Sequence, residues 1–82
     1  MLNELRSGVK VVGMKQLKRA IRDHLVQEVF LALDADPMMT DPIRALCGTE
    51  IPITEVSSMR ELGLACGISV GASSAGLLKQ AE

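Results

Sequence analysis

The basic side chains near the N-terminus are the residues of this sequence best suited to hold a ligand. Lys15, Lys18, Arg19 and Arg22 recur every three or four positions, and at ~100° per residue they fall within one arc of about 100° on a helical wheel. The opposite side carries mostly apolar residues, namely Met14, Leu17, Ala20 and Ile21, together with His24. The segment from Met14 to His24 therefore predicts an amphipathic helix with a basic stripe that attracts anions.

The start of this helix adds a second feature. Cations in a first helical turn are unfavourable by about 0.3–1 kcal/mol, because the free backbone N–H groups there already carry partial positive charge. Lys15 and Gln16 nevertheless follow Gly13 directly. Such a turn is well placed to receive a phosphate or the acceptor edge of a guanine. The alternative, from charge alone, is the solvated face of an ordinary surface helix.

Charge is divided unevenly along the chain. The net charge is −1, yet six of the nine basic residues precede Asp23, where Glu4 is the only acid. This asymmetry favours a localised patch that binds one nucleic-acid feature over a general affinity for polyanions. The chain has no Trp, no Tyr and one Phe, so bases cannot stack on an aromatic platform. Recognition of RNA would have to use shape, groove edges and apolar contact.

Other residues could do chemistry but lack the necessary partners. Asp34 and Asp36 follow an apolar stretch, as in phosphotransferases that use an aspartate nucleophile and magnesium. Met38 stands where those enzymes need Thr or Val, and an 82-residue chain lacks their further lysine and acidic motifs. We interpret both carboxylates as strand-end or helix-cap groups. The serines have no positioned base, because His24 is the sole histidine and its place on the apolar side of the helix predicts a core or boundary position.

The cysteines and the glycines predict no cofactor. Cys47 and Cys66 form no CxxC pair, which favours reduced, packed thiols. The stretch GISVGASSAG does not lead a strand into a helix with a GxGxxG or Walker pattern. We therefore predict no catalytic residue, no metal and no cofactor, and a protein that is not an enzyme.

Strands and helices alternate in the expected order of elements. We expect a short helix at Leu2–Ser7, strands at Lys10–Val12, Val26–Leu33, Ile53–Val56 and Ile68–Leu78, and helices at 14–24, 37–47 and 59–66. The last strand is rich in small residues, which let a helix or ligand approach its backbone. The pattern predicts an α/β fold, a three-layer sandwich around a sheet of about four strands, in a single domain over residues 1–82.

Cap residues mark the expected helix ends. Asp36 with Pro37 predicts one helix start, and Ser58-x-x-Glu61 is a capping box that predicts another. Pro42 either kinks the first of these helices or makes it restart with Asp41 as its cap. The chain shows no 18-residue apolar run and no signal pattern over its first eight residues, so we expect a cytoplasmic protein without a membrane partner.

Three blocks resemble one known family. VVGMKQLKRAI, then LALDADP, then SSMRELGLACGISVGAS together resemble the 7Ae-type large-subunit ribosomal proteins, whose members bind kink-turn RNA, and in particular its short bacterial members. The strongest match is LGLACGISV, and the similarity spans about Val9 to Leu78. The resemblance implies an α-β-α sandwich with a mixed sheet that recognises sheared G·A pairs and a flipped loop nucleotide.

The resemblance also assigns RNA-binding roles to individual residues. Gly13 would allow close approach of the backbone, Lys15 and Gln16 would contact the guanines, and Arg19 would contact a phosphate or base edge. Asp36 matches an acidic position that helps to hold the flipped nucleotide. The loop that covers this base is matched by Ile68, Ser69 and Val70.

The sequence also departs from the family pattern. Most archaeal and eukaryotic members carry Asn-Glu in place of Lys15-Gln16, and a basic residue in place of Met59. Gln16 still offers a carbonyl to a guanine amino group, and Lys-Gln is the pair usual in the bacterial members.

Three hypotheses of function follow. The first is a monomeric kink-turn binder whose partner is ribosomal RNA, a riboswitch or the ribosome, and not DNA. The second is a protein-interaction module on the same fold without RNA binding. The third is an enzyme, or a small-molecule or metal-binding domain, at the edge that carries Asp34 and Asp36.

Overall fold

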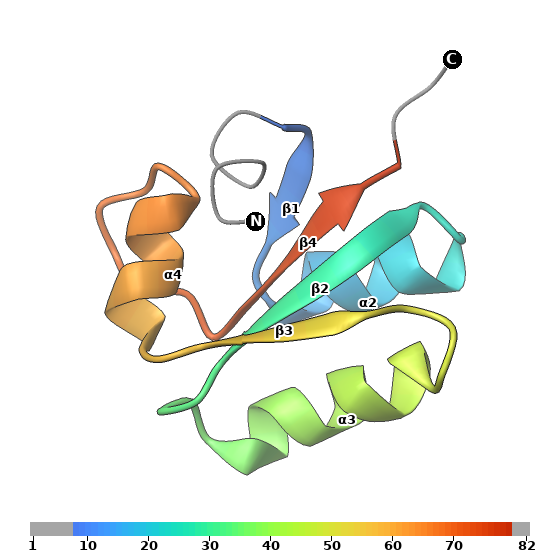
Figure 1. The fold of residues 1–82 in the computed structure, drawn as a ribbon, viewed down its shortest axis with the longest axis horizontal. Helices are drawn as coiled ribbons and strands as arrows, with labels where there is room; N and C mark the ends of the chain where they lie inside the picture. The colour runs from blue at the N-terminus through green and yellow to red at the C-terminus, as the bar shows by residue number, and fades with distance from the viewer. Residues whose placement is uncertain (1–7, 80–82) are drawn as a thin grey trace.

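The sheet has four strands and is mixed. A computed structural model describes residues 8–79, and the helix expected over residues 2–7 lies outside them. The strands are β1 (Lys10–Val12), β2 (Val26–Ala32), β3 (Ile53–Val56) and β4 (Ser74–Leu78), in the order β1-β4-β2-β3. β2 pairs parallel with β3, whereas β4 runs antiparallel to both β1 and β2. Consequently β1, β2 and β3 all end at one edge of the sheet, at the left in Figure 1, where β4 begins.

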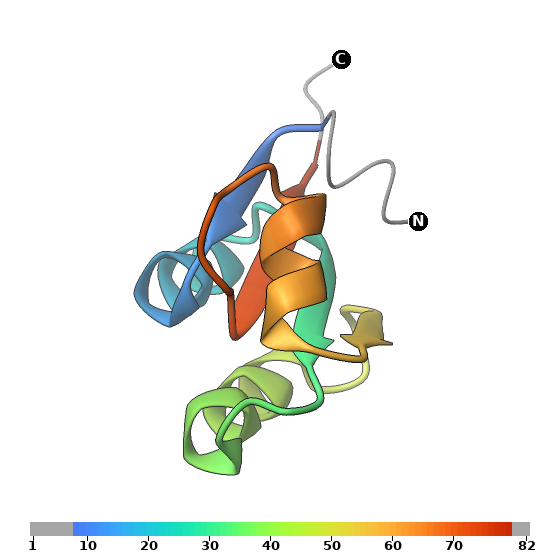
Figure 2. The same ribbon diagram turned by 90° about the vertical axis from the view of Figure 1, so that its left-hand side faces the viewer.

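In the described part of the chain, three helices cover the two faces of the sheet. They are α2 (Met14–Arg22), α3 (Pro37–Cys47) and α4 (Met59–Ala65). Val29 and Leu31 of β2 pack with residues of α2 and α3, whereas Phe30 between them packs with Leu62 of α4. The three-layer α-β-α arrangement predicted from the sequence is confirmed, with α4 set apart from α2 and α3 (Figures 1 and 2).

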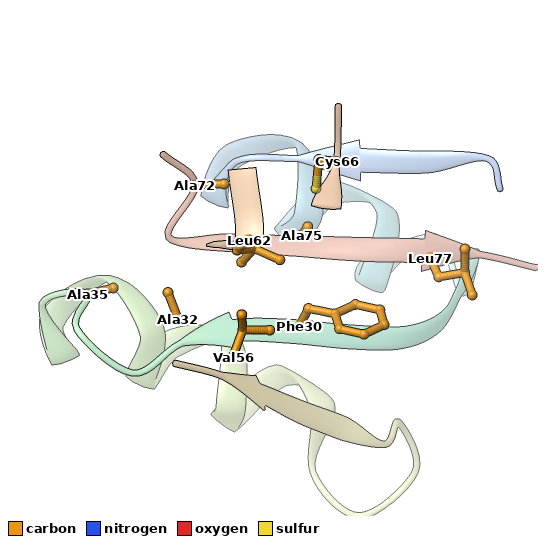
Figure 3. Close-up of a cluster of buried hydrophobic side chains, with 9 residues drawn as sticks. All are labelled: Phe30, Ala32, Ala35, Val56, Leu62, Cys66, Ala72, Ala75 and Leu77. Atoms are coloured by element: carbon orange, nitrogen blue, oxygen red, sulfur yellow. The ribbon is translucent and has the colours of Figure 1, made fainter. Parts of the chain in front are cut away.

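Each face has its own apolar core. The core under α4 contains Phe30 and Leu62, both fully buried, together with the buried thiol of Cys66 (Figure 3). Leu17 and Ile43 are fully buried in the other core, between the sheet and the helix pair α2 and α3. Each such side chain contributes about 1.5–3 kcal/mol relative to exposure.

Small residues in β4 bring α2 close to the sheet. A Cβ atom added at Gly76 would lie 2.5 Å from Cδ1 of Leu17. A side chain at position 76 would force Leu17 to shift, so the expectation that small residues here let a helix approach the strand is confirmed. The start of α2 is thereby fixed relative to β4.

The last strand is much shorter than expected. The prediction of a strand from Ile68 to Leu78 is wrong, because residues 68–73 form a loop and only Ser74–Leu78 is extended. The N–H of Ile68 donates to the carbonyl of Gly63 at 3.1 Å, and that of Ala72 donates to the carbonyl of Met59 at 3.0 Å. These backbone groups bind α4 and are not available to a neighbouring strand.

Some predicted element ends shift, and others are confirmed. α2 ends at Arg22, and His24 adopts a φ of 59°, the left-handed conformation that commonly ends a helix. Because α2 ends before His24, this residue does not lie on the apolar side of the helix. His24 is exposed, and its predicted core or boundary position is wrong. β2 ends one residue early, at Ala32. α3 does not restart at Asp41 but runs unbroken through Pro42.

The thiols of Cys47 and Cys66 are free and buried, which confirms the prediction of reduced, packed cysteines. Burial raises the pKa of both thiols above the ordinary value, and the nearby cations Arg44 and Lys10 oppose this only in part. Within residues 8–79, no helix is long and apolar enough to span a membrane.

Candidate functional site

All three helices begin at the edge where β1, β2 and β3 end. Two of them have side-chain caps. Asp36 Oδ1 accepts a hydrogen bond from the N–H of Met38 in the first turn of α3, at 2.9 Å. Ser58 caps α4, and Asp34 Oδ1 accepts from the N–H of Met59 at 2.7 Å. The interpretation of both aspartates as helix-cap groups is confirmed, since each carboxylate binds the N-terminus of a helix.

α2 differs from the other two helices because no side chain caps it. Gly13, at its N-cap position, has φ 97° and ψ 151° and offers no side-chain acceptor. The first turn also contains no acidic residue. Among residues 8–79, nothing accepts a hydrogen bond from the N–H groups of Met14, Lys15 or Gln16. The partial positive charge of this helix end therefore faces solvent.

Gly13 is required by the backbone conformation. Its φ of 97° lies in a region that side-chain-bearing residues rarely adopt. A Cβ at this position would meet nothing within 4 Å. The surface in front of Gly13 is consequently open to an incoming ligand.

The predicted amphipathic character of α2 is confirmed. Leu17, Ala20 and Ile21 are buried, and Lys15, Gln16 and Arg19 are exposed. The basic face includes a shallow hollow of about 480 Å³ lined by Met14, Lys15, Lys18, Arg19, Arg22 and Asp23. Within residues 8–79, none of the four cations in this hollow forms an ion pair. Their charge is therefore available to a ligand.

The loop between α4 and β4 carries the other predicted contacts. Ile68 is half-buried against the core under α4, Ser69 is exposed, and the side chain of Val70 is 68% exposed. Gly63 of α4 allows this loop to lie close, because a Cβ there would be 2.1 Å from the carbonyl oxygen of Val70. The loop is therefore held firmly against α4 while Val70 presents apolar surface to solvent.

Backbone hydrogen bonds fix this loop relative to α2. The N–H of Gly13 donates to the carbonyl of Ser74 at 3.0 Å, and that of Ala32 donates to the carbonyl of Ser73 at 3.0 Å. The loop thus ends between the last residues of β1 and β2. Figure 2 shows it running on the same side as the start of α2.

The predicted site residues consequently border one edge of the molecule. Gly13, Lys15 and Gln16 are at the start of α2, and Arg19 lies one turn further, in its last turn. Asp36 is at the start of α3, and Ile68, Ser69 and Val70 are in the loop. Asp36 differs from the others because its Oδ1 atom is already bonded to α3.

Sequence reasoning missed two features of this edge. The bond from Asp34 to Met59 joins residues 25 positions apart, and no local pattern signals such a pair. Leu33 and Met38 are apolar yet 60% and 83% exposed at the same edge. The signal in the sequence is their position: Leu33 directly precedes the acidic cap Asp34, and Met38 lies two residues after the acidic cap Asp36, where exposure to solvent is expected.

Comparison with known proteins gives matches over most of the chain. An RNA-binding protein of Geobacillus sp. (strain WCH70) is 41% identical over 76 residues, which cover 92% of this chain and 93% of the relative. An RNA-binding protein of Halalkalibacterium halodurans is 43% identical over 70 residues, covering 84% of this chain and 85% of the relative.

Solved structures share the fold. A 15.5 kD RNA-binding protein of Giardia lamblia superposes with a TM-score of 0.88 at 25% identity, covering 96% of this chain and 71% of that one. A protein of unknown function from Bacillus halodurans C superposes with a TM-score of 0.85 at 24% identity, covering 95% and 83%. Residues 2–82 match the ribosomal protein L7Ae/L30e/S12e/Gadd45 family. Sequence and fold therefore agree that this chain belongs to the ribosomal protein L7Ae/L30e/S12e/Gadd45 family.

Proposed function

We propose that this protein is a non-enzymatic RNA-binding protein that recognises kink-turns. The observation that carries the proposal is the uncapped start of α2, with exposed Lys15, Gln16 and Arg19 on this helix, on the same side of the molecule as the loop between α4 and β4 (Figure 2). Two relatives and one structural neighbour are named as RNA-binding proteins, which supports RNA as the ligand.

The start of α2 suits the exposed bases of a kink. Base edges in regular A-form RNA lie in a deep, narrow groove that side chains cannot read. A sharp bend opens that groove and displays the sheared G·A pairs. Lys15 can donate to guanine O6 or N7, and the Gln16 amide can accept from an amino group and donate to a ring nitrogen. The open space before Gly13 lets the RNA approach the backbone.

Arg19 lies one turn further along the same exposed face. A helix rises about 5.4 Å per turn. The guanidinium of Arg19 would therefore reach a phosphate or base edge next to the guanines that Lys15 and Gln16 contact. A planar guanidinium can bind either group with two hydrogen bonds. Arg19 therefore adds geometric selectivity to charge.

The flipped nucleotide would lie between α3 and the loop. Asp36 keeps its second carboxylate oxygen for the nucleotide while Oδ1 caps α3. Val70, 68% exposed, and the half-buried Ile68 provide the apolar contact. This contact takes the place of aromatic stacking in a chain with no Trp and no Tyr.

The proposed setting is a monomer in the cytoplasm that binds a kink-turn in ribosomal RNA, as part of the ribosome, or in a riboswitch. DNA lacks the 2′-hydroxyl groups and the A-form geometry of this target. We therefore propose no DNA partner.

The test is binding to a fluorescently labelled consensus kink-turn at physiological salt. The control is the same RNA with its G·A pairs replaced by Watson–Crick pairs. We expect tight binding to the first RNA that is lost with the second. With two or three phosphates neutralised, the slope of log K against log salt is expected at about −2 to −3.

Equal binding to both RNAs would refute recognition of the kink. A slope of log K against log salt as steep as that of a strongly basic protein would refute it as well. Absence of binding would favour the second candidate, a protein-interaction module on the same fold. The exposed apolar side chains of Met38 and Met39 on α3 are the observation that favours that candidate.

A further inference from the structure

Asp34 has a structural position that the proposed contacts do not use. It follows β2, is exposed, and its Oδ1 accepts from the N–H of Met59, the first residue of α4, at 2.7 Å. This distance is at the short end for a hydrogen bond to a charged acceptor, which is about twice as strong as a neutral one. The bond ties the end of β2 to the start of α4.

Met59 in turn holds the loop. Its carbonyl accepts from the N–H of Ala72 at 3.0 Å. Gly71 lies against it so closely that a Cβ there would be 3.2 Å from Cβ of Met59. Asp34, Met59 and Ala72 therefore form a continuous chain of contacts from the end of β2 to the loop.

The segment that carries Asp34 is itself rigidly placed. Ala35 is 6% exposed in the core under α4, and its N–H donates to the carbonyl of Ala32 at 3.3 Å. Asp36, next in the chain, caps α3. One short turn thus holds the starts of two helices, α4 through Asp34 and α3 through Asp36.

We propose that Asp34 is a positioning residue of the RNA site, which sets the loop of residues 68–70 over the flipped nucleotide through Met59. The proposal rests on the proposed function and adds a residue that acts on RNA only through the protein backbone. It also explains how the backbone of the loop can be placed reproducibly although the hydrogen bonds of the Ile68 and Ala72 N–H groups go to α4 and not to the sheet. The start of α2 is joined to the far end of the loop by a different bond, from the N–H of Gly13 to the carbonyl of Ser74.

The test measures the affinity of an Asp34 variant for two RNAs and asks whether loss of the negative charge strengthens or weakens binding. The RNAs are a kink-turn and the same kink-turn with an abasic residue at the flipped position. Asp34→Ala removes one negative charge, and by electrostatics alone this would strengthen binding to a polyanion. Positioning predicts the opposite, a loss of about fivefold on the full kink-turn, or about 1 kcal/mol.

The loss should depend on the flipped base. On the abasic RNA the same variant should lose less than about twofold, because residues that act on one contact show coupled effects. Asp34→Asn keeps an acceptor oxygen and should restore most of the affinity. Asp41→Ala, a matched loss of an exposed acid on α3, should not weaken binding to either RNA.

Several outcomes would overturn the inference. They are wild-type affinity of Asp34→Ala for the full kink-turn, an equal loss on both RNAs, or an equal loss in Asp41→Ala. Should Asp34→Ala not fold, Asp34→Glu keeps the charge, displaces the carboxylate by one methylene group and is judged by the same two RNAs. Failure of the wild-type protein to bind the kink-turn would instead refute the proposed function, so the two failures are distinguishable.

Discussion

A methyl group added to α4 at Gly63 should move the loop that covers the proposed nucleotide site. In Gly63→Ala the new Cβ would lie 2.1 Å from the carbonyl oxygen and 3.0 Å from the carbonyl carbon of Val70. Even close carbon–oxygen contacts stand at about 3.3 Å, so the loop must retreat by about 1 Å. Both Val70 atoms belong to the backbone, and no side-chain rotation relieves the overlap.

The expected effect on RNA binding follows from that displacement. A gap of about 1 Å forfeits up to about half of a contact's energy. Full burial of a valine side chain contributes about 1.5–3 kcal/mol, and Val70 is 68% exposed in the free protein, so most of its surface is available for burial by RNA. The loss is therefore about 1 kcal/mol, which corresponds to about fivefold weaker binding.

The free energy of unfolding should change by an amount similar to the change in affinity. Overpacking costs about 1–3 kcal/mol, and alanine offsets about 1 kcal/mol of this as the better helix former. We expect a free energy of unfolding lowered by about 0–2 kcal/mol. Anisotropy titration with the labelled kink-turn and urea unfolding measure the two quantities on the same samples.

Gly48→Ala is the matched control. Gly48 ends α3 with a φ of 54°, and a side chain in this conformation costs about 1–2 kcal/mol. The residue lies at the end of α3 that is remote from the RNA edge. The control should lose stability and keep its RNA affinity. Unchanged affinity in Gly63→Ala, or equal losses of affinity in both variants, would refute the reasoning.

Three further predictions concern other parts of the molecule. Arg19→Ala should weaken kink-turn binding by about 1–3 kcal/mol, whereas Arg22→Ala, an equal loss of charge further from the helix start, should cost less than about threefold; equal losses in an anisotropy titration would mean general charge attraction. Ser58→Ala removes the cap of α4 and should lower the free energy of unfolding by about 1 kcal/mol in urea titration, and an unchanged midpoint would contradict that role. Burial raises the pKa of the Cys47 and Cys66 thiols, so the unfolded chain loses these protons at a lower pH than the folded protein does. The free energy of unfolding should therefore fall as pH rises above about 8.5. A Tm that increases from pH 7 to 9.5 would contradict this direction.

Local signals predicted much of the fold. Asp36 with Pro37, and Ser58 with Glu61, mark helix starts through hydrogen bonds within a few residues. The spacing of the buried apolar residues of α2, at every third or fourth position, likewise depends only on helical geometry. The helix starts and the amphipathic character of α2 were predicted correctly because neighbouring residues determine them.

Features that depend on distant residues could not be predicted in this way. The segment from Ile68 to Ser73 contains small and β-branched residues that suit a strand, yet bonds to Met59 and Gly63 hold it as a loop. The bond between Asp34 and Met59 requires the tertiary structure. Lys15 and Arg19 of α2 were identified by charge pattern, and Gln16 by its place in the first turn after Gly13. The candidate residues of the loop came only from the family resemblance.

The place of β4 in the sheet bears on when the protein can fold during its synthesis. β4 is the last strand along the described chain, yet it lies between β1 and β2 and pairs with both. A nascent chain that has reached the end of α4 leaves those two strands without the partner that joins them. Gly13 and Ala32 then also lack the carbonyl acceptors of Ser74 and Ser73. The edge proposed to bind RNA therefore assembles only after residues 74–78 have left the ribosome, and the sheet cannot be completed during synthesis of the segment before them.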